Sequence, residues 1–66
     1  MTTAFEFVEV VGVSTKSVED AVQNAVRHVS ATRGVSWFEI VSIRGRIVEP
    51  SRETEYQVTV KFGCRV

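Results

Sequence analysis

The chain has 66 residues, enough for one domain, residues 1–66, and too few for a large core. Eight Lys plus Arg balance eight Asp plus Glu, so the formal net charge is zero and gives no long-range attraction to nucleic acid or to an anionic membrane. One Cys and one His exclude an internal disulfide and a typical four-ligand zinc site. Oligomerisation is the remaining way to stabilise so small a domain.

The sequence gives no sign of export or of membrane insertion. Residues 1–16 lack a basic start followed by an uninterrupted apolar stretch. No apolar run approaches the roughly 20 residues that a helix needs to span a bilayer. We therefore expect a cytoplasmic protein, which agrees with a single free thiol.

The first half of the chain predicts a strand followed by a helix. Residues 5–11 are rich in Phe and Val, a composition typical of a strand, and Gly12 is expected to end it. Ser17 stands where a helix N-cap is expected, and Gly34 is the expected end of the helix. His28 lies off the apolar stripe and is expected to be exposed. The stripe itself recurs with helical spacing: Val18, Ala21, Val22, Ala25, Val26 and Val29.

The second half predicts a β-hairpin. Residues 35–48 and 53–66 are expected strands, joined by a polar turn at 49–52 that contains the only Pro. The expected core face of the last strand alternates with polar residues: Tyr56, Val58, Val60, Phe62, Cys64 and Val66. The order β-α-β-β predicts an α+β fold, with one helix packed on one face of a three-stranded antiparallel sheet.

The middle strand leaves two pairing registers to choose between. It is apolar on both sides, with Phe38 and Ile40 on one side and Trp37, Val41 and Ile43 on the other. Regular pairing would place Trp37 with the apolar set of the last strand, whereas a one-residue bulge at Gly45 would place it with Gln57. We favour the bulge, because Gly is the residue expected there. Phe38 and Ile40 would then cover the helix, and Trp37 would lie on a face that partner subunits must bury.

Trp37 is the only Trp and lies in a strand whose neighbours already supply apolar bulk. On residue chemistry alone, a core or interface role is the more common one for a large aromatic side chain. The alternative is a stacking platform for a flat heteroaromatic ligand, because a large rigid ring gives contact area at little entropic cost. Both interpretations stay open at this point.

Five short stretches span nearly the whole chain: residues 9–14 (EVVGVS), 21–26 (AVQNAV), 37–40 (WFEI), 43–45 (IRG), and 55–58 (EYQV) leading into 61–63 (KFG). In these stretches and in their order, the chain resembles the dodecin family of small flavin-binding proteins. The resemblance implies a β-α-β-β protomer, a hollow dodecamer, and flavins bound in pairs at the contacts between subunits.

The resemblance also implies a set of cofactor-binding residues. Trp37 corresponds to the family's stacking tryptophan, and Gln57 to the glutamine that hydrogen-bonds the polar edge of the isoalloxazine ring. Arg44 and Arg65 occupy the places from which bacterial members contact the FMN phosphate, with Arg46 as a nearby competitor. The residue types suit these roles, because an indole stacks on a flat ring, an amide both donates and accepts, and Arg binds phosphate with two N–H groups.

The function implied by the resemblance is flavin binding and storage without catalysis. The expected ligand is FMN or riboflavin, bound non-covalently, with coenzyme A as a further candidate and no metal. No general base, nucleophile or Gly-rich dinucleotide loop accompanies Trp37 in the sequence. A flavin-dependent redox protein and a structural assembly without flavin remain alternatives. A nucleic-acid module that stacks bases on Trp37 and Phe38 is disfavoured by the zero net charge and by Glu39.

Overall fold

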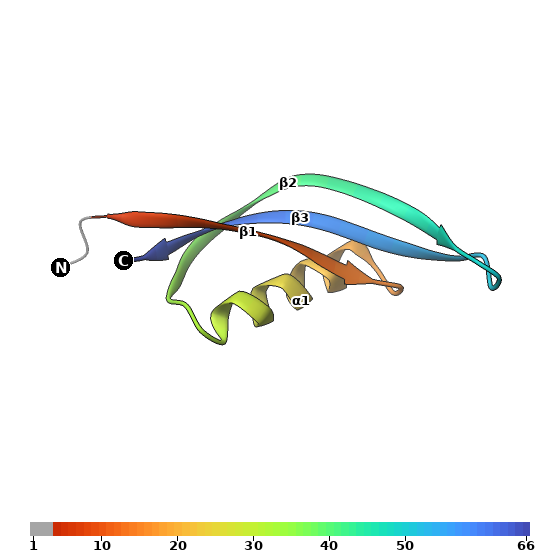
Figure 1. Ribbon diagram of the computed structural model, residues 1–66, viewed down its shortest axis with the longest axis horizontal. Helices are drawn as coiled ribbons and strands as arrows, with labels where there is room; N and C mark the ends of the chain where they lie inside the picture. Colours follow the sequence, from red (N-terminus) through yellow and green to blue (C-terminus); the bar gives the residue numbers. More distant parts are fainter. Residues whose placement is uncertain (1–3) are drawn as a thin grey trace.

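The computed structural model describes residues 4–66, and these form four elements in the predicted order. The elements are β1 (Phe5–Ser14), α1 (Val18–Ser30), β2 (Val35–Val48) and β3 (Glu53–Arg65). β3 lies between β1 and β2 in one antiparallel sheet, and α1 packs on one face of that sheet (Figure 1). The predicted fold, one helix on a three-stranded antiparallel sheet, is confirmed.

The start of α1 agrees with the prediction. The Oγ atom of Ser17 accepts a 2.9 Å hydrogen bond from the backbone N–H of Asp20, which satisfies one of the unpaired donors of the first turn. His28 is exposed, as expected. The apolar stripe supplies the buried residues of the helix: Ala21, Val22, Ala25 and Val29.

The end of α1 comes earlier than predicted. The C-cap is Ala31, and the N–H of Arg33 bonds to the carbonyl of Val29 at 3.0 Å, which closes the last turn before Gly34. No glycine in residues 4–66 has a positive φ, so Gly34 does not act as a left-handed helix stop. A Cβ at this position would lie 2.9 Å from Nη2 of Arg65, the end of a flexible side chain that can move aside, so this contact does not require a glycine.

Gly12 lies inside β1, although the sequence predicted that it would end the strand. A Cβ at Gly12 would lie 2.0 Å from the carbonyl oxygen of Ala21, so only a glycine lets α1 approach β1 this closely. The side-chain amide of Asn24 adds a 2.8 Å hydrogen bond to the carbonyl of Val13. Gly12 therefore fixes the position of the helix on the sheet.

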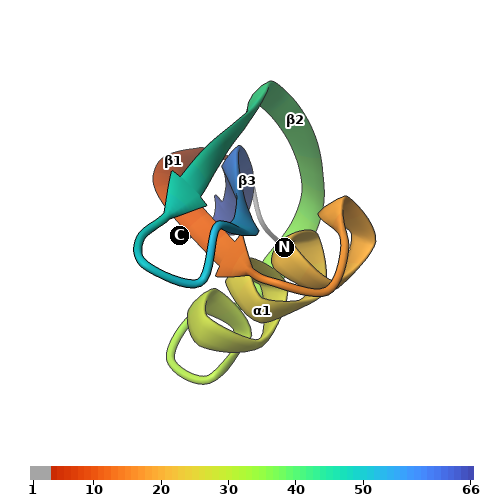
Figure 2. The ribbon, with the colours of Figure 1, turned by 90° about the vertical axis from the view of Figure 1, so that its right-hand side faces the viewer.

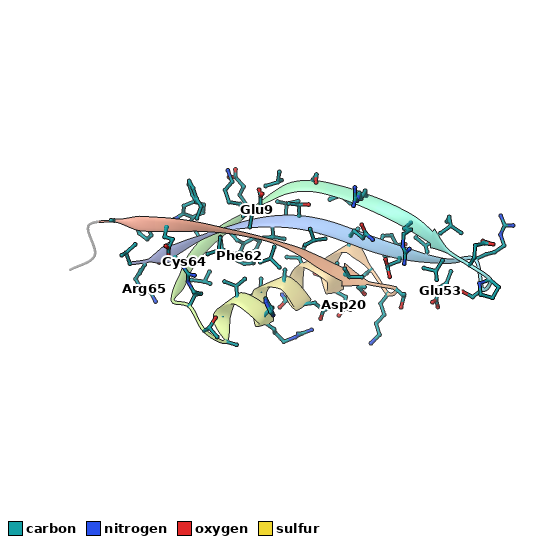
Figure 3. All side chains as sticks on the ribbon, viewed as in Figure 1. Glu9, Asp20, Glu53, Phe62, Cys64 and Arg65 are labelled. Atoms are coloured by element: carbon teal, nitrogen blue, oxygen red, sulfur yellow. The ribbon has the colours of Figure 1, made fainter. Side chains whose placement is uncertain are left out.

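The core lies between α1 and the side of β3 that faces it. The fully buried residues of β3 are those predicted from its alternation: Val58, Val60, Phe62 and Cys64. Figure 3 shows Phe62 and Cys64 on the helix side of the sheet and Glu9 on the opposite side. Val66 was also predicted to be in the core and is instead exposed beyond the end of β3. The buried helix residues are only Ala and Val, so the core is thin and one protomer gains little stability from it.

The register of β2 contains two irregularities, and neither is at the predicted position. The pairing with β3 shifts at Ser36 and again at Val41, whereas Gly45 pairs regularly with Tyr56. The predicted bulge at Gly45 was therefore wrong. The nearest atom to a Cβ at Gly45 would be 3.8 Å away, so nothing at this position requires a glycine.

The predicted consequence for Trp37 is nevertheless confirmed. Trp37 pairs with Gly63, which lies on the same side of β3 as Gln57. Ile43 was predicted on the side of Trp37 and pairs instead with the buried Val58, because the second irregularity changes the alternation between them. The side of the sheet that carries Trp37 and Gln57, opposite α1, is called the helix-free face below.

α1 covers only part of the sheet, because it lies along β1 and β3 and leaves β2 overhanging (Figures 1 and 2). Phe38 and Ile40 do face the helix side, as predicted, but they are only half covered. The overhang exposes these apolar side chains: Phe38, Ile40, Ile43 and Ile47. The helix-free face exposes a second set: Phe5, Phe7, Val11, Val13 and Trp37. The described chain is a slab of 51 × 20 × 14 Å with apolar surface on both sides.

Candidate functional site

The indole of Trp37 lies flat on the backbone of Gly63. A Cβ on Gly63 would be 2.1 Å from Cε2, 2.4 Å from Cζ2 and 2.6 Å from Nε1 of the indole. Distances this similar to three adjacent ring atoms place the missing Cβ under the face of the ring, not at its edge. Trp37 is still 41% exposed, so the opposite face of the ring is open to a stacking partner.

Phe7 forms a wall beside this platform. Phe7 on β1 and Trp37 on β2 both pair with Gly63, and their rings meet where that residue has no side chain. The ring centroids are 5.6 Å apart and the planes are inclined at 78°, an edge-to-face arrangement that fixes the tilt of the indole. Nζ of Lys61 lies 4.9 Å from the centre of the Phe7 ring and 3.9 Å from the Glu39 carboxylate. The sequence did not predict a role for Phe7 or Gly63. The pattern that could have indicated them is a glycine on the central strand that pairs with an aromatic residue on each neighbouring strand.

Gln57 lies on the helix-free face inside a network of charged side chains. Its Oε1 atom accepts a 3.0 Å hydrogen bond from Nε of Arg44, and its Nε2 atom donates a 2.9 Å hydrogen bond to Glu55. Nε of Arg46 donates to the same carboxylate at 3.1 Å. The hydrogen bonds from Gln57 and then Arg46 hold the pKa of the Glu55 carboxyl below its usual value of 4.5. Glu55 is therefore ionised at neutral pH.

Trp37 and Gln57 are not brought together within one protomer. Trp37 lies over Gly63, which is six positions along β3 from Gln57. At 3.3 to 3.4 Å per residue, this separation is roughly 20 Å. It exceeds the length of a flat ligand of three fused rings, so one such ligand cannot contact both residues of the same chain.

The two arginines that were predicted to bind phosphate lie at different ends of the sheet. Arg44 is opposite Gln57 and bonds to it. Arg65 lies at the other end of β3, beside the segment that joins α1 to β2 (Figure 3). Its Nη1 atom donates a 2.8 Å hydrogen bond to Oγ of Ser36, the residue next to Trp37. Arg65 is therefore the arginine close to the stacking platform, and Arg44 belongs to the network of Gln57.

Residues 4–66 contain no group of three or more His, Cys, Asp or Glu side chains placed to hold a metal ion. Their single helix is too short and too polar to cross a membrane. The thiol of Cys64 is buried beneath the sheet. The exposed indole and the Gln57 network are the features of this surface that can recognise a flat, polar-edged ligand.

Comparison with known proteins gives consistent matches over almost the whole chain. Residues 5–66 match the family described as Dodecin. The dodecin of Thermus thermophilus is 40% identical over 63 residues, which cover 94% of this chain and 90% of that protein. A crystal structure of a Thermus thermophilus protein superposes with a TM-score of 0.84 at 39% identity, covering 96% of this chain and 93% of that one. For the dodecin of Streptomyces davaonensis the TM-score is 0.85 at 31% identity, again covering 96% and 93%.

Proposed function

The chain belongs to the dodecin family, and on that premise we propose that it binds flavin, either FMN or riboflavin, in pairs between the subunits of a dodecameric shell. The observation that carries the proposal is the indole of Trp37, which has one face on Gly63 and the other open on the helix-free face. An electron-poor ring system stacked on an indole gains roughly 1 kcal/mol beyond the burial of its area.

The residues present fit an isoalloxazine ring. The amide of Gln57 uses one N–H and one acceptor position within the protein, so one donor and one acceptor remain for the imide edge of the ring. Arg65, near the platform, is of the type that binds a phosphate with two N–H groups. When bound, the flavin supplies a redox-active and light-sensitive ring, and stacking on an indole quenches its excited state by electron transfer.

Several features support an assembly of many copies. β1 and β2 are both edges of the sheet, and exposed apolar side chains lie on both of its faces. The thin core leaves a single 66-residue protomer marginally stable. The separation of roughly 20 Å between Trp37 and Gln57 means that a ligand held by both residues must lie between two copies of the chain.

We propose storage or sequestration of the flavin, and not catalysis. The groups placed against Trp37 are the ring of Phe7 and the backbone of Gly63, which do not transfer protons. A flavin stacked between an indole and a second flavin also leaves no ring face for a substrate. Coenzyme A is the second ligand that we propose for the assembly. The proposed location is the cytoplasm, where a thiol such as that of Cys64 stays reduced.

The test begins with native mass spectrometry and an absorbance spectrum of the protein as purified. The expected result is a mass of twelve chains with retained flavin, together with quenching of riboflavin fluorescence on titration. Trp37→Ala should raise the dissociation constant at least about tenfold, or roughly 1.4 kcal/mol, and should restore fluorescence to any flavin that still binds. Trp37→Phe keeps a smaller ring, so its dissociation constant should lie between those of the wild type and Trp37→Ala. An intact, colourless shell that neither binds nor quenches riboflavin would be a structural assembly without flavin.

A further inference from the structure

The side-chain amide of Gln57 lies between a cation and an anion, and these two charges determine the orientation of its oxygen and nitrogen atoms. Its oxygen faces the guanidinium of Arg44 at 3.0 Å, and its nitrogen faces the carboxylate of Glu55 at 2.9 Å. The reversed amide would bring its oxygen to the carboxylate and its N–H groups to the guanidinium. Both contacts would be repulsive, so the two charges select one orientation.

Glu55 is the better fixed of the two charged neighbours. Its side chain is only 18% exposed and it accepts a second hydrogen bond, from Arg46 at 3.1 Å. It lies two residues from Gln57 on the same face of the same strand, so the distance between them changes little when the sheet flexes. Arg44, in contrast, reaches across from the edge strand β2 on a long and exposed side chain. The orientation of the amide therefore depends mainly on Glu55.

A fixed amide presents its unused groups in a fixed order. The free acceptor position is on the amide oxygen, at the end of the amide nearer Arg44, and the free N–H is on the amide nitrogen, at the end nearer Glu55. A ligand that pairs with both must carry a donor and an acceptor in the complementary order. An imide edge, in which an N–H has a carbonyl on each side, offers such a pair when the ring is held in place and its N–H faces the amide oxygen.

We propose that Glu55 is a positioning residue for ligand recognition, which holds Gln57 in the orientation that accepts from the N–H of an imide and donates to its carbonyl. Arg44 acts on the same amide from the other side, whatever further contact it makes with a phosphate. The choice of ligand rests on the proposed function, whereas the positioning of Gln57 by Glu55 rests on the hydrogen bonds of the protein.

The test compares riboflavin with N3-methylriboflavin, which has a methyl group in place of the imide hydrogen. The assembled wild-type protein should bind riboflavin at least about tenfold more tightly, the factor expected for loss of one good hydrogen bond. In Glu55→Ala this preference should fall at least about threefold, because the amide can then turn over. Adding Glu55→Ala to Gln57→Ala should change the preference no further, which distinguishes positioning from direct contact with the ligand.

The matched control is Glu53→Ala, which removes an exposed carboxylate from the same strand outside the network and should leave the preference unchanged. If the wild type prefers riboflavin and Glu55→Ala keeps the full preference, the positioning role is refuted and flavin binding stands. If the wild type binds no flavin, the proposed function fails. The side-chain amide NMR signals of Gln57 in the ligand-free protein then decide the positioning role: a shift in Glu55→Ala and none in Glu53→Ala supports it, and no shift in either overturns it.

Discussion

Gly63→Ala is the sharpest perturbation of the stacking platform, because it adds one methyl group beneath the indole and changes no charge. The new Cβ would lie 2.1 Å from Cε2 of Trp37, whereas ordinary contact begins at about 3.4 Å. The ring must therefore retreat by about 1.3 Å or tilt. Either movement breaks the edge-to-face contact with Phe7.

The expected effect follows from this displacement. Forcing a methyl group into a packed contact typically destabilises a protein by about 1 to 3 kcal/mol, and the half-exposed position of Trp37 favours the low end of that range. Flavin affinity should suffer more than stability, because a lifted indole no longer meets the ligand face to face. We expect the dissociation constant for riboflavin to rise at least about tenfold, or roughly 1.4 kcal/mol.

The assay is a fluorescence titration of riboflavin, with size-exclusion chromatography to confirm that the assembly persists. Gly45→Ala is the matched control, since it makes the same change in the same sheet with the nearest atom 3.8 Å from the new Cβ. It should bind flavin as the wild type does and be stabilised by up to about 1 kcal/mol, because alanine restricts the unfolded chain.

A double-mutant cycle completes the experiment. In a Trp37→Ala background there is no ring to displace, so Gly63→Ala should then have little further effect on flavin affinity. A Gly63→Ala protein that assembles and quenches riboflavin as the wild type does would refute the idea that the platform depends on this glycine. An equal loss of affinity with and without the indole would refute it as well.

Three further predictions concern the arginines, the acidic residue and the protomer. Arg65→Gln should weaken FMN binding and leave riboflavin binding unchanged, whereas Arg44→Gln should weaken the binding of both flavins because Arg44 bonds to Gln57. Isothermal titration with each flavin measures these affinities. Equal losses of FMN and riboflavin affinity in Arg65→Gln would indicate a role of Arg65 in assembly. Because the pKa of Glu55 is lowered in the folded protein, its ionised form stabilises the fold above about pH 4.5, and this contribution disappears as the pH falls further. The difference in melting temperature between wild type and Glu55→Gln should therefore be constant from about pH 6 to 8 and become smaller in acid. The isolated protomer should not be stably folded, a claim that a folded monomer in light scattering at micromolar concentration would contradict.

The fold was predictable where a periodic pattern carried the information. The helix followed from a stripe of Val and Ala with a Ser N-cap, and the core face of β3 followed from strict alternation. Glycines carried no comparable signal, because their roles depend on what approaches them. Gly12 faces a helix carbonyl, Gly34 faces the guanidinium of Arg65, and Gly63 faces an indole. Gly45 has no atom closer than 3.8 Å to the position of a Cβ, yet it is the glycine at which the sequence predicted a bulge.

The candidate site was predictable in its members and not in its contacts. Trp37 and Gln57 were named from the resemblance, but their pairing was not predicted. β2 pairs regularly with β3 from Val48 to Ser42, which sets the network around Gln57, and the irregularities at Val41 and Ser36 affect only the part of β2 that carries Trp37. Once the register is known, the hydrogen bonds of the network follow from the cross-strand pairs. Arg46 lies opposite Glu55, which has the opposite charge, and Arg44 lies opposite Gln57 and donates to its amide oxygen. Local sequence does not mark the irregularities at Val41 and Ser36, since they depend on packing against β3.

The separation of Trp37 from Gln57 couples ligand binding to assembly. If each flavin is held by the indole of one copy and the amide of another, the flavin binds the assembled state and not the free protomer, so it stabilises the assembly by mass action. At a riboflavin concentration of 100 times the dissociation constant, the gain is about 2.7 kcal/mol per site. Thermal dissociation followed by light scattering should therefore move to higher temperature with riboflavin in the wild type, and the shift should shrink to about half or less in Trp37→Ala and shrink in Gln57→Ala as well. Riboflavin that binds tightly without moving the dissociation temperature would show that one chain holds it alone.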